Sequence, residues 1–340
     1  MHMADSLLSP VVGTAMCAVS AAALALSVSK IKKDDLCEKK IPIIGVMGAF
    51  VFAAQMINFT IPGTGSSGHI GGGILLAAMI GGFPALLSLS AVLIIQCLFF
   101  ADGGLLALGC NIFNMGVIPC LIVYPILFKP LLKKDMTIGN ITAVSIIAVV
   151  VSLQLGAFGV VFETRLSGVT ELPFKVFVLL MQPIHLAIGI IEGIVTAAVL
   201  FFVYKMRPEI MESSFKRTAI KNSVPVKNII ITLAVIALIT GGLLSLFVSS
   251  HPDGLEWSIE NITGSTEIKK ENAFLKGAAT IQEKTAFLPD YNFPDTGEEG
   301  MAAGTTIAGI LGGIFTFLLA GITVLIISVV KKKRNGIQGT

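Results

Sequence analysis

The first two residues of the chain, Met1 and His2, have the composition of a metal chelate. A free terminal amine, the backbone nitrogen of His2 and its imidazole can bind one cation together, because they close a five-membered and then a six-membered ring. The three nitrogens lie in one plane, which is the geometry that Ni(II) and Cu(II) prefer. The alternative is an ordinary N-terminus, since chain ends are usually frayed and functionless. A fourth nitrogen in the same plane would favour the chelate.

His69 is the candidate for that fourth nitrogen. It lies in residues 63–73, where glycine occupies six of eleven positions. Glycines allow close backbone approach and positive φ, which suits a loop that folds over a bound N-terminal tip. The alternative is a flexible loop whose histidine is hydrogen-bonded among glycines. The sequence therefore predicts a metal site at Met1, His2 and His69, provided that the fold brings them together.

Membrane helices must position these residues. Hydrophobic residues make up 54% of the 340 and charged residues only 13%, and the mean hydropathy is +0.87. Such a chain cannot cover itself with a polar surface, so we expect a polytopic membrane protein. No basic region precedes the first apolar run, so we expect no signal peptide. Met1 is expected to stay, because removal of an initiator Met usually needs a small second residue.

The expected fold is an all-α bundle of about seven transmembrane helices, followed by two more that flank an outer polar segment. The predicted spans are 10–29, 41–59, 74–80 with a second run to 100, 105–128, 138–162, 174–204, 228–248 and 304–330. The run 74–80 is too short to cross a core of about 30 Å at about 1.5 Å per residue, and residues 81–84 break it. Non-helical backbone at that depth is tolerated only inside protein or beside a cavity, which independently favours a site near His69.

The distribution of charge predicts the domains and the orientation. We expect a metal-binding core at 1–205, a cytoplasmic linker at 206–227 and a C-terminal part at 228–340 with an outer segment at 251–303. Lysines and arginines concentrate in the alternate loops 30–40, 129–134, 205–227 and 331–334. These loops are cytoplasmic by the positive-inside rule. The N-terminus and the loop of His69 then lie outside, and the C-terminus lies inside.

Further polar residues lie in or near the spans. His185 and Glu192 are seven residues apart on one helix face, and an ionisable residue in a span is a functional candidate. Because Gly189 and Gly193 mark a packed helix face, an interhelical contact or a coupling role is favoured over metal binding. The side chains that could fix an imidazole tautomer from a distance are Gln55, Asn58, Ser67, Asn111 and Asn114. Simple helix-to-helix hydrogen bonds are the alternative for all of them.

Motifs for catalysis and phosphate binding are absent from the sequence. It has no G-x-x-x-x-G-K-[ST] loop, no H-E-x-x-H, and no Ser/His/Asp or Cys/His arrangement for nucleophilic catalysis. The cysteines are scattered singly, which favours packing roles; they are Cys17, Cys37, Cys97, Cys110 and Cys120. The segment 251–303 carries ten acidic residues against four lysines. A solvated lobe that Trp257 and Tyr291 pack onto the core is favoured over a surface that concentrates cations.

An ordered set of motifs resembles a known family. The motifs are Met1-His2, Leu8-Ser9-Pro10, residues 49–58, Gly68-His69, residues 100–109 with Asn111 and Asn114, and His185 with residues 189–196. Over roughly residues 1–205 they resemble the CbiM/NikM family, the substrate-binding (S) component of energy-coupling-factor (ECF) transporters for cobalt and nickel. Residues 252–256 and 289–291 resemble the PDGLE/NikN-type part that is fused to it in NikMN-like chains.

The resemblance implies a transporter subunit and not an enzyme, in a bacterial or archaeal cytoplasmic membrane. It implies that Met1, His2 and His69 hold the metal. The implied partners are a transmembrane coupling (T) protein and a pair of cytoplasmic ABC-type ATPases, with no nucleic acid and no organic cofactor. We expect Ni(II) as the transported substrate, because four planar nitrogens suit low-spin Ni(II) and the tail resembles nickel fusions. Co(II) in the same site, for cobalamin-linked uptake, is the first alternative, and an ATP-independent metal permease is the second.

Overall fold

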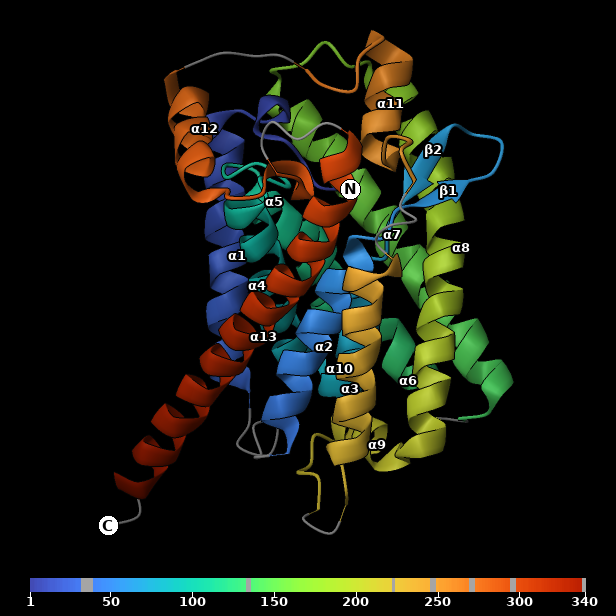
Figure 1. The fold of residues 1–340 in the computed structure, drawn as a ribbon, viewed down its shortest axis with the longest axis vertical. Coiled ribbons are helices and arrows are strands. Elements are labelled where there is room, and N and C mark those ends of the chain that lie inside the picture. Colours follow the sequence, from blue (N-terminus) through green and yellow to red (C-terminus); the bar gives the residue numbers. More distant parts are fainter. Residues whose placement is uncertain are drawn as a thin grey trace.

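The structure is a computed structural model that describes residues 1–31, 39–132, 136–221, 224–244, 249–268, 273–293 and 298–337. Helices make up most of the described chain and form one bundle (Figure 1). Six of them are long and apolar enough to cross a membrane, and two further apolar helices are shorter. The chain is therefore an all-α polytopic membrane protein, as predicted.

The helices follow the predicted spans closely. The long ones are α1 (Pro10–Lys30), α4 (Gly82–Phe99), the continuous stretch Leu108–Leu132, α7 (Ile138–Ser167), α8 (Phe174–Met206) and α13 (Glu298–Ile337). The shorter apolar ones are α2 (Lys40–Gln55) and α10 (Lys227–Gly242). The remaining elements are α3 (Gly73–Ile80), α9 (Pro208–Lys216), α11 (Gly254–Thr263), α12 (Ala273–Thr285) and the short turns η1 (Asp5–Leu7) and η5 (Pro289–Tyr291).

Local sequence explains two of the long helices. Ser9 caps α1 by accepting a hydrogen bond from the backbone N–H of Val12, and Pro10 suits the first helical position because it needs no donor there. The stretch 108–132 begins as α5 (Leu108–Ile112), widens into the π-helix η3 (Phe113–Phe128) and ends as α6 (Lys129–Leu132). Pro119 and Pro125 lie inside it, where the lack of an N–H interrupts normal α-helical bonding.

Glycines shape the packing of the spans. The predicted break is confirmed at Gly81, whose φ of 90° ends α3 and lets α4 begin at once. The packed face on α8 is also confirmed, because a Cβ on Gly189 or Gly193 would lie 3.1 Å or 2.5 Å from the Cα atoms of Val150 and Ile146 on α7. These two long helices therefore pack backbone against backbone.

The second span ends earlier than predicted. Instead of continuing to residue 59, α2 stops at Gln55, and the chain forms an antiparallel hairpin of β1 (Phe59–Ile61) and β2 (Ser66–Gly68). Glycine and hydroxyl residues dominate here and favour turns over helix, and Gly63 and Gly65 have positive φ. The hairpin lies at the same end of the bundle as Met1, α11 and α12 (Figure 1), which we call the hairpin end.

The C-terminal helices pack closely on the core. Helices α10 and α13 contact α2 and each other, and Gly241 lies against Gly309 where α10 and α13 cross. The predicted linker contains α9, whose Ile210, Met211 and Phe215 are buried. Some residues that support the sequence predictions lie outside the described residues; they are Lys32, Lys33, Cys37, Lys133, Lys134 and the predicted span end Val248. The other four cysteines are free.

Candidate metal centre

The N-terminal tip is inserted into the bundle. Met3 is fully buried, and its backbone N–H donates to Oδ1 of Asn111 at 2.8 Å. The amide nitrogen of Asn111 and the backbone N–H of Gly104 both donate to the carbonyl of Met3. Leu7 and Leu8 are each 1% exposed. These contacts argue against a frayed end, because they hold the first residues in one place.

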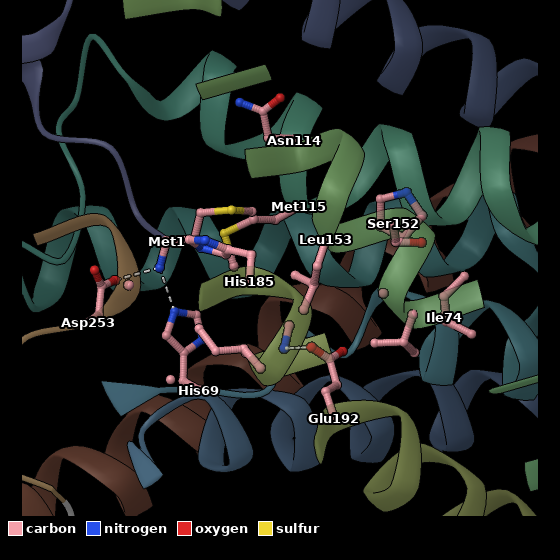
Figure 2. Close-up of a pocket in the computed structure, with 17 residues that line it drawn as sticks. Met1, His69, Ile74, Asn114, Met115, Ser152, Leu153, His185, Glu192 and Asp253 are labelled. Carbon is pink, nitrogen blue, oxygen red and sulfur yellow. Dashed lines mark hydrogen bonds and ion pairs between the residues drawn. The ribbon is translucent and has the colours of Figure 1, made fainter. Parts of the chain in front are cut away.

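The amine of Met1 lies between two side chains from distant parts of the chain (Figure 2). Its nitrogen is 2.9 Å from Nε2 of His69 and 2.5 Å from Oδ2 of Asp253. Nδ1 of His69 lies 3.4 Å from the carbonyl oxygen of Ile70, which assigns the proton to Nδ1 and leaves the lone pair of Nε2 facing the amine. Burial, and then the Met1 ammonium, lower the pKa of His69 well below its ordinary value. The imidazole is therefore neutral and ready to bind a metal.

The Met1–His69 spacing matches one edge of a square metal site. Metal–nitrogen bonds of about 2.0 Å place neighbouring ligands of a planar square about 2.8 Å apart. The amine and Nε2 are 2.9 Å apart. Two of the four predicted nitrogens are therefore already at a spacing that one cation can bridge.

His2 lies beside these residues, with its ring turned to other partners. The imidazole stacks on that of His69 with centroids 5.1 Å apart, while Nδ1 is 3.2 Å from Oδ1 of Asp102 and Nε2 is 3.2 Å from Oε1 of Gln96. Burial lowers the pKa of His2 even though Asp102 opposes this effect. Metal binding through Nδ1 requires the ring to leave Asp102.

Glu192 and Gln55 hold the loop that carries His69. The carboxylate of Glu192 accepts hydrogen bonds from the backbone N–H groups of Gly71 and Gly72, both at 2.9 Å. The amide of Gln55 donates to the carbonyl of Gly71 at 2.8 Å. Glu192 was predicted to make an interhelical contact or to act in coupling, but the structure gives it a loop contact from α8. It thereby fixes the backbone two and three residues beyond His69.

Four other predicted residues contact neither His2 nor His69 in the described hydrogen bonds. Asn114 donates to Oε2 of Glu163 at 2.8 Å, and Nδ1 of His185 donates to the carbonyl of Met181. Asn114 and His185 line a cavity of about 30 Å³ that also borders Met1, His69 and Glu192. The hydroxyl of Ser67 donates to the carbonyl of His251. The carbonyl of Asn58 accepts from the backbone N–H of Ser249.

Sequence reasoning missed three residues of the centre: Asp253, Asp102 and Gln96. Asp253 lies in the quoted motif of residues 252–256, and Asp102 in the quoted motif of residues 100–109, but nothing local to these motifs indicated contact with residues 1 and 2. In the described residues, no group of three or more His, Cys, Asp and Glu side chains could hold a metal. The candidate centre depends instead on the terminal amine and a backbone nitrogen.

The fold and the centre define a polytopic membrane protein with a buried, nitrogen-rich N-terminal site. Residues 2–210 match the family CbiM, described as "Cobalt uptake substrate-specific transmembrane region". Residues 227–329 match the PDGLE domain. Because the CbiM match covers more than half of it, the chain belongs to the CbiM family and carries a fused PDGLE domain.

Relatives of known name match either nearly the whole chain or a part of it. The chain is 30% identical over 319 residues to a putative fused nickel transport protein NikMN of Archaeoglobus fulgidus, covering 94% of this chain and 96% of that one. It is 31% identical over 176 residues to the cobalt transport protein CbiM of Sorangium cellulosum, covering 50% and 76%. A crystal structure described as a transition metal transporter superposes with a TM-score of 0.54 at 29% identity, covering 64% of this chain and 99% of that one.

Proposed function

We propose that the chain captures Ni(II) at the outer face of the membrane, as the substrate-binding component of an ATP-driven uptake transporter. The ligands are the amine of Met1, the backbone nitrogen and imidazole of His2, and Nε2 of His69. The observation that carries the proposal is the distance of 2.9 Å between the Met1 amine and Nε2 of His69. The names of relatives support a transition metal as the substrate.

Loading the site leaves its charge unchanged. Before binding, the Met1 ammonium contributes one positive charge. After binding, the amine is neutral, the deprotonated backbone nitrogen of His2 contributes one negative charge and Ni(II) contributes two positive charges. The net charge of the site is again one positive charge. Two protons leave as the metal arrives. This balance suits a buried site, where an added unpaired charge would be costly.

The wider organisation follows the sequence predictions. We propose that residues 1–205 are the metal-binding core, that 206–227 are the cytoplasmic linker and that 228–340 form the second unit. The N-terminus at the hairpin end and the C-terminal end of α13 lie at opposite ends of the bundle (Figure 1), in support of an outer N-terminus and a cytoplasmic C-terminus. We assign ATP hydrolysis to a pair of separate ATPases, joined to this chain by a transmembrane coupling protein.

Replacing His2 tests the chelate. His2→Gln removes the imidazole and with it the six-membered ring, while the large second residue keeps Met1 in place. The purified native chain is expected to bind Ni(II) as a yellow diamagnetic species, since four planar nitrogens favour the low-spin ion. His2→Gln should abolish this absorption while thermal unfolding and gel filtration stay unchanged. An unchanged spectrum in His2→Gln would refute the N-terminal chelate, and mass spectrometry of both chains verifies that Met1 is retained and free.

Two alternatives are separated by further measurements. Competition between Ni(II) and Co(II) for the purified chain tests the choice of metal, with tighter Ni(II) binding expected. Metal uptake by cells that lack the ATPase partners tests the mechanism of transport. Uptake should be lost in those cells, whereas an ATP-independent permease would keep it.

A further inference from the structure

Residues 251–257 of the PDGLE domain lie directly against the loop that carries His69. The backbone N–H of Ser67 on β2 donates to the carbonyl of Pro252 at 2.8 Å, and its hydroxyl donates to the carbonyl of His251 at 2.8 Å. The indole N–H of Trp257 donates to the carbonyl of Thr64 in the hairpin turn at 2.9 Å. The C-terminal domain is therefore hydrogen-bonded along the edge of the candidate metal centre.

Residues 252–256, which we call the cover segment, fit closely against α8. A Cβ added to Gly254 would lie 3.0 Å from Cε1 of His185 and 3.2 Å from Cδ1 of Ile188. Leu255 is 2% exposed. A larger residue at position 254 would crowd these side chains, so glycine allows the close fit of the cover segment on α8.

Asp253 uses its two carboxylate oxygens for different purposes. Oδ1 accepts the backbone N–H groups of Leu255 and Glu256 at 2.7 Å and 2.9 Å and so caps α11. Oδ2 accepts the Met1 ammonium at 2.5 Å. A carboxylate fixed by a helix cap cannot turn away easily. The position of Oδ2 is therefore set by the fold of the C-terminal domain.

We propose that the cover segment closes the outer side of the metal site and that Asp253 is the residue that positions the Met1 amine for metal binding. This inference rests on the proposed function. An amine bound to a metal keeps two N–H groups, so one of them can remain on Oδ2 while the nitrogen lone pair faces the metal position that it shares with Nε2 of His69. The C-terminal domain thereby contributes directly to the site of the core.

The charge of Asp253 serves the same role. A buried charge is stable only when it is paired, and the proposed site carries one positive charge both empty and loaded. Asp253 brings one negative charge to within 2.5 Å of the amine. Its carboxylate can therefore balance the positive charge of both the empty and the loaded site without moving.

The test compares Asp253→Asn with Glu260→Gln in the full chain. Asn is as good a helix cap as Asp, so Asp253→Asn keeps α11 capped but removes the charge that holds the amine. Glu260 is exposed on the same helix, and Glu260→Gln removes the same charge without touching the site. Gly254→Ala is a second variant, which crowds His185 and Ile188 and so disturbs the fit of the cover segment with no change in charge.

Two readouts are needed for each variant. Ni(II) affinity is measured by competition with a coloured chelator, and Asp253→Asn should lose 10- to 100-fold, as is typical when a group that orients a ligand is removed. The reactivity of the Met1 amine is measured without metal, by acetylation with an N-hydroxysuccinimide ester and mass spectrometry of the N-terminal peptide. Asp253→Asn and Gly254→Ala should both speed this acetylation about tenfold, and Glu260→Gln should behave as the native chain.

Each outcome decides the inference. Faster acetylation and weaker binding in Asp253→Asn and Gly254→Ala, but not in Glu260→Gln, support it. Native acetylation in Asp253→Asn, or equal effects in Glu260→Gln, overturn it. If Asp253→Asn does not yield folded protein, Gly254→Ala decides by the same criteria. If the native chain binds no Ni(II), the proposed function fails, and the acetylation rates alone judge whether Asp253 positions the amine.

Discussion

The amino nitrogen of Met1 lies 2.9 Å from Nε2 of His69, although 68 residues separate them. The hydrogen bonds of Asn111 to Met3 hold one partner, and those of Glu192 to Gly71 and Gly72 hold the loop of the other. The spacing is thus maintained from both sides by buried polar side chains.

Replacing His69 by Ala should weaken Ni(II) binding about 100-fold or more, because it removes one of four ligands, a larger change than losing a group that only orients a ligand. Titration calorimetry of the detergent-solubilised chain measures this. His251→Ala is the matched control, since His251 is exposed on the same side of the bundle, and it should bind as the native chain does. Equal losses in both variants would argue for a general effect of histidine removal.

Ni(II) affinity should fall at least about tenfold for each pH unit lost between pH 8 and pH 6. Binding releases protons from the amine and the backbone nitrogen, so acid opposes it. His69 contributes little in this range, because burial and the Met1 ammonium lower its pKa well below the ordinary value and keep it neutral. Affinity measured across this range in a non-chelating buffer checks the slope, and pH-independent binding would contradict a deprotonated ligand set.

Replacing Glu192 by Ala should destabilise the chain and weaken metal binding. The change leaves the N–H groups of Gly71 and Gly72 without their acceptors, which costs about 2–6 kcal/mol at about 1–3 kcal/mol for each buried group. Glu192→Gln keeps one acceptor oxygen and should lie between Ala and native. Thermal unfolding in detergent, followed by Ni(II) titration of the folded fraction, gives both quantities. Native stability in Glu192→Ala would rule out a structural role for the loop contact.

Asn111 and Asn114 should behave differently despite being about one helical turn apart. Asn111→Ala frees Met3 and should reduce Ni(II) affinity 10- to 100-fold, because the N-terminal tip loses its anchor. Asn114→Ala removes a hydrogen bond to Glu163 and should lower stability with a smaller effect on affinity. Calorimetry and thermal unfolding of the two variants in parallel make the comparison. A native Ni(II) affinity in Asn111→Ala would show that Asn111 is dispensable.

Much of the fold was readable from hydropathy and glycine pattern. The break at Gly81 and the packed face at Gly189 and Gly193 were predicted correctly, because a short apolar run and a pair of spaced glycines have local causes. The hairpin of residues 59–68 was not predicted, and the predicted span 41–59 extends beyond the end of α2 at Gln55. Apolar composition alone does not tell where a helix ends inside a membrane protein. The neighbouring helices can bury the apolar side chains of a helix or of a strand equally well.

The sequence by itself determined the membrane class, most helix positions and the candidate ligands Met1, His2 and His69, because hydropathy, helix breaks and chelate rings depend on neighbouring residues. Only the tertiary structure decided that Asp253 meets the Met1 amine across 252 residues and that Glu192 holds the glycine loop. Those contacts depend on how α8, α11 and the hairpin pack together. Packing is a property of whole helix surfaces, so no short stretch of sequence encodes it.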